Sequence, residues 1–186
     1  MTHLANSASI LRADYFELFG LPRAFAVNLE RLGREYHTLQ HRFHPDRFGA
    51  AAEADRRRAL EISTHVNSAY LTLRRVLPRA RYLLTLLGVD PAEDRTAMPP
   101  GFLVRQMELR ESLEVARGHS DAVALHQIKE RLRGECAACE TRLACLFDEA
   151  PDFEGAAECV RMLGFYDSLR RDADRMIEAT EDPYAV

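Results

Sequence analysis

The sequence predicts an all-α protein with an N-terminal antiparallel helical hairpin, which carries a short first helix, and a C-terminal three-helix bundle. Apolar residues recur at steps of three and four along several long segments, which is the period of a helix that buries one face. Signals for strands are few. Prolines at 91, 99 and 100 indicate a linker or an ordered loop between the two parts. We expect the first part to span residues 12–78, a short helix and the linker to fill 79–101, and the bundle to span 102–180.

The first part begins with a short helix around residues 14–20. Residues 1–9 before it are small and polar, and we expect them to be frayed. Asp14 can cap the short helix, Glu17 favours its positive end and Gly20 can end it. Two longer helices follow, whose apolar stripes are Leu29, Leu32, Tyr36, Leu39 and Phe43, and then Ala59, Ile62, Val66, Ala69, Leu73 and Val76. Joined by a loop of about ten residues, such helices lie antiparallel and bury their stripes together.

The two longer stripes are separated by the segment Arg42–Phe48, with the sequence RFHPDRF. Pro45 fixes its own φ angle and keeps His44 out of the helical region, so the helix before it should end near Phe43. His44 and Asp46 then lie on either side of a stiff residue, in a loop positioned by helices at both ends, which is typical of a recognition loop. A structural alternative stays open, since proline and aspartate are also common in ordinary turns.

A short helix over residues 79–87, started by Pro78, leads toward the second part. Three longer helical patterns follow it. Gly118 ends the first, Ser120 can cap the second, and the third begins after Pro151. Their stripes are Phe102, Leu109, Leu113 and Ala116; Leu125, Ile128, Leu132, Cys136, Cys139, Leu143 and Leu146; and Phe153, Ala156, Val160, Leu163, Tyr166 and Leu169. Short connections make such helices an antiparallel bundle.

Some apolar residues of the bundle lie away from its predicted core. At about 100° per residue, Leu103 and Met107 point well off the face that carries Phe102 and Leu109. Phe165 likewise lies off the centre of its stripe. A wide core face is the alternative explanation, and it stays open. An exposed apolar patch rimmed by charge suits a protein partner, however, so we favour a binding site here.

Composition excludes several function classes. The formal net charge is -4, so a nucleic-acid partner has no electrostatic support. No run approaches the roughly 18 apolar residues of a membrane span. The opening residues lack the basic and apolar regions of a secretory signal. We therefore expect a cytoplasmic protein with neither a nucleic-acid nor a membrane partner.

The cysteines invite a metal interpretation, since Cys136 and Cys139 have the spacing of half a zinc motif. Both fall on the core stripe of a helix, where free cysteine behaves as a small hydrophobe, and no second pair follows. We expect no metal and no cofactor. An enzyme has no support either, because the sequence shows no nucleophile–base pair at motif spacing and no glycine-rich phosphate loop.

The short aromatic helix, the long helix, the His44-Pro45-Asp46 motif and the next long helix together resemble the J-domain of DnaK-class co-chaperones. The likeness extends to the HscB-type co-chaperones of iron–sulfur cluster assembly, over roughly residues 14–178. The segments that carry it are DYFELFGLP (14–22), YHTLQ (36–40), HPDRF (44–48), VNSAY (66–70), RYLL (81–84), FL (102–103), QMELRE (106–111) and RMLGFYDSLR (161–170).

This resemblance implies a co-chaperone that is not itself an enzyme. Its J-domain would stimulate the ATPase of a DnaK-class (HscA-like) chaperone, and its bundle would carry the (IscU-like) scaffold protein on which iron–sulfur clusters are assembled. A J-domain co-chaperone for a different client is the alternative. The implied chaperone-binding residues are Arg34, Arg42, His44, Pro45, Asp46 and Arg47. The implied scaffold-binding residues are Leu103, Val104, Met107, Glu108, Arg110, Glu111 and Phe165.

Two features depart from the family pattern. The second helix is only weakly basic, since its charged residues leave a net charge of +1: Arg31, Arg34 and Arg42 against Glu30 and Glu35. Arg47 stands where lysine is usual, which keeps the charge but changes the donor geometry. We therefore expect the chaperone contact to depend less on salt than in other J-domains.

Overall fold

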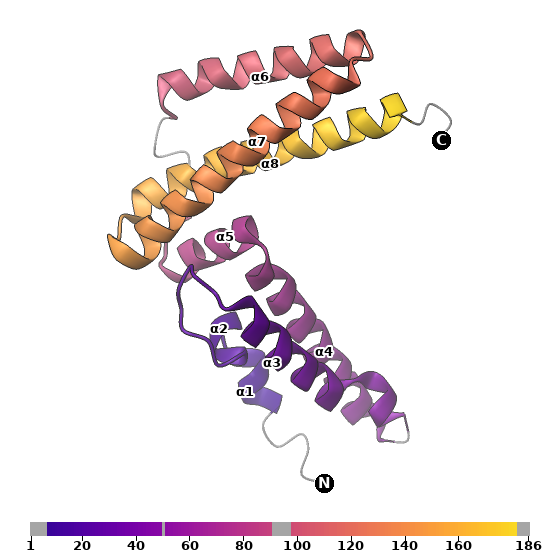
Figure 1. Cartoon of the computed structure of the whole chain (residues 1–186). Helices are drawn as coiled ribbons and strands as arrows, with labels where there is room; N and C mark the ends of the chain where they lie inside the picture. Colours follow the sequence, from indigo (N-terminus) through magenta and orange to yellow (C-terminus); the bar gives the residue numbers. More distant parts are fainter. Residues whose placement is uncertain (1–6, 50, 91–97, 182–186) are drawn as a thin grey trace. The chain divides into compact units, whose positions relative to one another are not determined.

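All the regular secondary structure that the computed structural model describes, over residues 7–49, 51–90 and 98–181, is helical (Figure 1). The predicted all-α class is confirmed. Contacts divide the chain into two compact units, Met1–Leu83 and Leu84–Val186. Within these described residues, no helix is both long and apolar enough to cross a membrane.

Unit 1 is built on a hairpin of two helices, α3 (Leu29–Phe43) and α4 (Glu53–Arg74), which lie side by side in Figure 1. The short helix α2 (Tyr15–Leu18) and the one-turn 3₁₀ helix η1 (Pro45–Phe48) both pack on α4. The predicted stripes meet in the core. Its fully buried side chains include Phe16, Phe19, Leu32, Phe43, Ile62, Val66 and Leu73.

Two of the shorter helices differ from the sequence expectation. The expected fraying of residues 1–9 is wrong for the part that the structure describes, because helix α1 (Ser7–Arg12) packs on α4 with Ile10 and Leu11 half-buried. Residues 1–6 lie outside the described part. Helix α5 (Val76–Leu86) begins earlier than the predicted residue 79. Pro78 is tolerated there because the first turn of a helix needs no N–H at that position.

Unit 2 contains three long helices, α6 (Pro100–Gly118), α7 (Ala122–Ala144) and α8 (Phe153–Glu181), with a π-helical turn η2 (Cys145–Glu149) after α7. Helices α7 and α8 run along each other, and α6 packs on both less extensively (Figure 1). The core is formed by the predicted stripes, with Leu109, Leu113, Leu125, Leu132, Leu143, Val160, Leu163 and Tyr166 buried. Part of the predicted linker, residues 91–97, lies outside the described residues.

The cap of α7 corrects another expectation. The side chain of Asp121, rather than that of Ser120, accepts the backbone N–H of Ala124, at 2.9 Å. Ser120 instead has a φ of 52°, a left-handed conformation that turns the chain between α6 and α7. Both residues are good helix caps, so sequence alone does not choose between them.

Asp14 joins the first elements of unit 1. Its carboxylate accepts the backbone N–H groups of Phe16 and Glu17 at 2.8 and 3.0 Å, and Glu17 accepts the N–H of Asp14 in return at 3.3 Å. Arg23 Nε donates to the other carboxylate oxygen at 2.6 Å. Asp14 therefore holds both the start of α2 and the segment that leads to α3.

We predict that Asp14→Ala lowers the free energy of unfolding by about 1 kcal/mol, because two N–H groups at the start of α2 lose their acceptor. Urea denaturation followed by circular dichroism measures the loss. Asp14→Asn keeps a capping oxygen and should be milder. An unchanged denaturation midpoint for Asp14→Ala would contradict the role of this cap.

Candidate functional site

The loop after α3 presents two of its polar side chains to solvent. His44 ends α3 in an extended conformation, with φ −60° and ψ 130°, and Pro45 starts η1, so α3 stops at Phe43 as predicted. The His44 ring caps η1, since its Nδ1 accepts the backbone N–H of Asp46 at 3.4 Å. The side chains of His44 and Asp46 are 52% and 89% exposed. The loop backbone is therefore fixed while its functional groups stay accessible.

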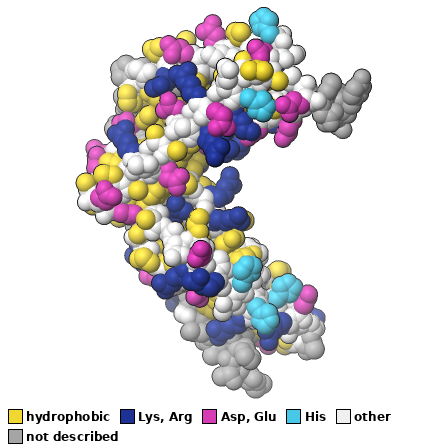
Figure 2. Space-filling view, in the orientation of Figure 1, with side chains coloured by type: hydrophobic (Ala, Val, Ile, Leu, Met, Phe, Trp, Pro, Cys, Tyr) yellow, Lys and Arg dark blue, Asp and Glu magenta, His cyan; other side chains and the backbone are white. Residues whose placement is uncertain are grey.

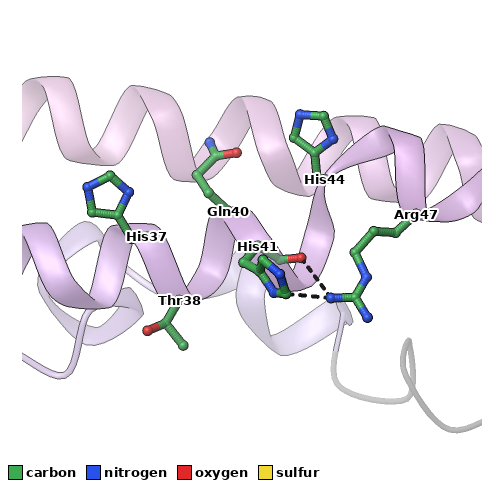
Figure 3. Close-up of a pocket in the computed structure, with 6 residues that line it drawn as sticks. All are labelled: His37, Thr38, Gln40, His41, His44 and Arg47. Carbon is green, nitrogen blue, oxygen red and sulfur yellow. Dashed lines mark hydrogen bonds between the residues drawn. The ribbon is translucent and has the colours of Figure 1, made fainter.

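A shallow groove runs from the last two turns of α3 to η1 (Figure 3). It is lined by His37, Thr38, Gln40, His41, His44 and Arg47. Arg47 reaches back from η1, and its Nη1 donates to the carbonyl oxygen of His41 at 3.2 Å and lies 3.1 Å from Nδ1 of the same ring. Figure 2 shows histidine side chains gathered beside lysine or arginine side chains over this part of unit 1. The groove combines aromatic rings with one fixed positive charge.

Helix α4 positions this groove from behind. Tyr36 donates its hydroxyl proton to Oδ1 of Asn67 at 2.9 Å, and Gln40 donates its amide to the same oxygen. Ser63 donates to Oε1 of Gln40 at 3.4 Å. The Tyr36 ring also stacks on Tyr70, with centroids 4.0 Å apart. Sequence reasoning missed Ser63 and Asn67 as supports, although their spacing of four beside the stripe of α4 was a usable signal.

The arginines that the resemblance implied are not gathered at one place. Arg47 lines the groove, whereas Arg34 and Arg42 do not. Both are exposed on α3. The guanidinium of Arg42 lies 5.1 Å from the ring centroid of Phe43, and the residue lines a neighbouring hollow with Leu18 and Leu39. Of these three arginines, Arg47 is therefore the one that lines the groove beside His44.

A second surface lies on α6. Leu103, Val104 and Met107 are 50%, 57% and 73% exposed, whereas Phe102 and Leu109 on the opposite face are buried. We call Leu103, Val104 and Met107 the apolar patch. Its charged neighbours on the same helix, all exposed, are Glu108, Arg110 and Glu111. The patch lies outside the core, as the spacing of Leu103 and Met107 predicts.

Phe165 is only partly exposed. Its ring meets the rings of Phe102 and Tyr166 edge-on, with centroids 5.5 and 5.7 Å apart. The guanidinium of Arg110 lies 5.4 Å from its ring centroid. The prediction that Phe165 lies away from the core is therefore correct only in part, because its ring also packs inside unit 2.

Comparison with known proteins places the chain in a family. The family model described as the HSCB C-terminal oligomerisation domain matches residues 98–174. A "Co-chaperone protein HscB homolog" of Ralstonia nicotianae is 45% identical over 178 residues, which are 95% of this chain and 99% of that relative. The chain belongs to the HscB co-chaperone family. The resemblance seen in the sequence motifs is thereby confirmed.

Solved HscB structures share the fold. Chaperone HscB from Vibrio cholerae superimposes with a TM-score of 0.79 at 34% identity, covering 90% of this chain and 99% of its own. Human co-chaperone HscB gives a TM-score of 0.82 at 29% identity, with 88% and 81% covered. The helical hairpin and the helical C-terminal unit described above are therefore the architecture of HscB proteins.

The four cysteines of this HscB family member form no disulfide bond. Cys136, Cys139 and Cys159 are at least half-buried, whereas Cys145 is exposed. Burial raises the pKa of Cys136 to about 11. A hydrogen bond with the thiol of Cys159, together with burial, raises the pKa of Cys139. In the described part of the chain, no three His, Cys, Asp or Glu side chains are placed to share a metal ion. Zinc binds the thiolate form, which such surroundings disfavour.

We predict that protein purified without chelator contains far less than one zinc or iron per chain, because the thiols of α7 keep their protons. Elemental analysis of the pure protein measures this directly. A stoichiometric metal that disappears in the variants Cys136→Ser and Cys139→Ser would show that α7 carries a metal site.

Proposed function

We propose that this chain is a co-chaperone of iron–sulfur cluster assembly. Unit 1 docks on the ATP-bound form of a DnaK-class (HscA-like) chaperone and accelerates ATP hydrolysis there. Unit 2 carries the (IscU-like) scaffold protein. The observation that carries the proposal is the exposed His44-Pro45-Asp46 loop, held at the end of a packed helical hairpin in a member of the HscB family.

The loop is suited to act on another protein rather than on a small substrate. Its two polar side chains project from a backbone that α3 and η1 fix, so little conformational entropy is lost on docking. Arg47 adds a positive charge beside them, which suits an acidic surface of the chaperone. The chain itself carries out no catalysis in this proposal and needs no cofactor. It changes the rate of a reaction in its partner.

The apolar patch on α6 supports a client site. Three exposed aliphatic side chains on one helix, with charged residues around them, have the composition of an interface centre and its rim. Phe165 and Arg110 lie next to each other at its border and offer an aromatic and a cationic contact. These are the residue types that dominate binding energy at interfaces.

Linking the two sites in one chain raises the effective concentration of one partner near the other. A scaffold bound to unit 2 is kept at high effective concentration beside a chaperone bound to unit 1. The alternative, a co-chaperone for a different client, shares the loop but not the need for a scaffold, so scaffold binding separates the two. In either case we expect the chain to act in the cytoplasm, without nucleic acid or membrane as a partner.

His44→Gln should abolish stimulation of the chaperone ATPase, because the His44 ring is an exposed group that docking would contact directly. Helical content should not change, since His44 lies outside α3 and its side chain is not in the core. Steady-state ATP hydrolysis with and without the variant measures the effect. Full stimulation by His44→Gln would reject the proposed role of the loop, and unchanged scaffold binding is the matched control.

The double change Leu103→Ala with Met107→Ala should weaken scaffold binding strongly, by about 1 to 2 kcal/mol for each side chain, without strict additivity. Calorimetric titration with a scaffold protein measures it. Glu108→Ala and Glu111→Ala, at the rim, should have smaller effects that depend more on salt.

Stability measurements supply the control for this patch. Leu109 is buried on the same helix. Its replacement, Leu109→Ala, should lower the free energy of unfolding by roughly 2 to 5 kcal/mol. The double patch variant should cost much less. Phe165→Ala should lower both stability and binding, because its ring also packs on Phe102. If the patch variant unfolds readily but binds the scaffold normally when folded, the client site lies elsewhere.

A further inference from the structure

Arg47 is held against the end of α3 by His41, as the dashed lines in Figure 3 show. Arg47 Nη1 lies 3.1 Å from Nδ1 of the His41 ring and donates to the carbonyl oxygen of His41 at 3.2 Å. A guanidinium has donors only. The contact between the two nitrogens is therefore a hydrogen bond only when His41 Nδ1 carries a lone pair, which places the proton of the neutral ring on Nε2.

These two contacts decide where the positive charge of Arg47 lies. Arg47 is exposed on η1, and a long side chain of this kind is otherwise free to adopt many rotamers in solvent. The carbonyl of His41 belongs to the last turn of α3, where carbonyl groups lack helical partners and a cation is favoured. His41 thus fixes Arg47 in the groove that His44 also lines.

Among the residues that the structure describes, no carboxylate lines the groove around His41. The side chains that surround it are His37, Thr38, Gln40, His44 and Arg47. The carboxylate of Asp46 lies 3.5 Å from Nδ1 of His44. Helix α4, which packs on both α3 and η1, meets this part of α3 with the neutral side chains of Ser63 and Asn67 through Gln40. A proton added to His41 would therefore meet the positive charge of Arg47 without a compensating anion among the groove residues.

We propose that His41 is the positioning residue for Arg47 when the chain docks on its chaperone, and that protonation of the His41 ring removes one of the two contacts that hold Arg47. A protonated ring has no acceptor at Nδ1 and places a second positive charge beside the guanidinium. Docking therefore weakens once His41 gains a proton, because Arg47 is then no longer held in the groove by the ring. This inference rests on the proposed function, because it describes how the chaperone contact is regulated.

Two variants of His41 separate positioning from a general structural role. Asparagine carries its side-chain oxygen at the δ position, as histidine carries Nδ1, so His41→Asn keeps an acceptor for Arg47 that does not titrate. Glutamine places its amide one bond farther out, so His41→Gln removes the δ acceptor at similar size and polarity. Residue 41 is exposed near the end of α3, which keeps the effect of either change on folding small.

The experiment measures the affinity of each variant for an ATP-bound DnaK-class chaperone at about pH 7.5 and at about pH 6, a span over which histidine side chains in general change charge. Wild type should bind more weakly at the lower pH, by up to about fivefold, which corresponds to the loss of one net hydrogen bond. His41→Asn should match wild type at the higher pH and lose much less at the lower one. His41→Gln should already be about fivefold weaker at the higher pH, with little further loss.

Arg47→Ala tests whether His41 acts through Arg47. Adding His41→Gln to Arg47→Ala should change the affinity no further, because the contact is already absent. Independent losses from the two changes, a wild-type pH profile in His41→Asn, or tighter binding at the lower pH would each overturn the inference while leaving the proposed function intact. A wild-type chain that binds no ATP-bound DnaK-class chaperone at the higher pH would overturn the proposed function and this inference together.

Discussion

The packing of α3 on α4 is the interaction on which unit 1 depends. The two helices are in contact, and Leu32 and Phe43 on α3 and Ile62, Val66 and Leu73 on α4 are all buried. Each such side chain contributes about 1.5 to 3 kcal/mol on leaving water. The connecting loop contributes no fully buried side chain between His44 and Gly49, so its packing on α4 is not needed to form this core. Its polar groups are free to serve a partner, and its geometry follows from the two helices and from Pro45.

The core of unit 2 is distributed unevenly among its helices. Helices α7 and α8 pack on each other most extensively, and α6 packs on them with one face. A helix that is apolar all round is normally buried. Helix α6 is not such a helix, because it also carries many charged residues, yet Leu103, Met107 and Val115 are at least half exposed while Phe102 and Leu109 are buried. These three exposed residues are not part of the core, to which α6 contributes its other face. A surface partner explains these residues better than folding does.

The sequence predicts the elements whose signal is local and periodic. The stripes of the long helices, the stop at Phe43 and the burial of Cys139 all follow from spacing or from one stiff residue. It does not predict contacts that fold distant segments together. Arg79 donates to the carbonyl of Leu73 at 2.7 Å and lies 4.9 Å from the ring centroid of Phe25, although spacing links none of the three. Helix α1 was missed for the same reason, since tertiary packing rather than composition supports so short a helix.

The same limit applies to the site, because spacing does not show which arginines on α3 already have hydrogen-bond partners. Of the arginines on α3, Arg31 is engaged elsewhere, because its Nη2 donates to the carbonyl of Gly20 at 2.6 Å. Gly20 itself has a φ of 60°, a conformation that glycine adopts without strain. The net charge of +1 is unchanged by this bond, but the guanidinium of Arg31 is held at Gly20 and is not directed toward the loop. Exposed charges are screened within about 8 Å at physiological salt, so long-range attraction contributes little here. Under the proposed function, recognition of the chaperone depends instead on the directed groups at the end of the hairpin, where the position of a single guanidinium counts for more than the total charge.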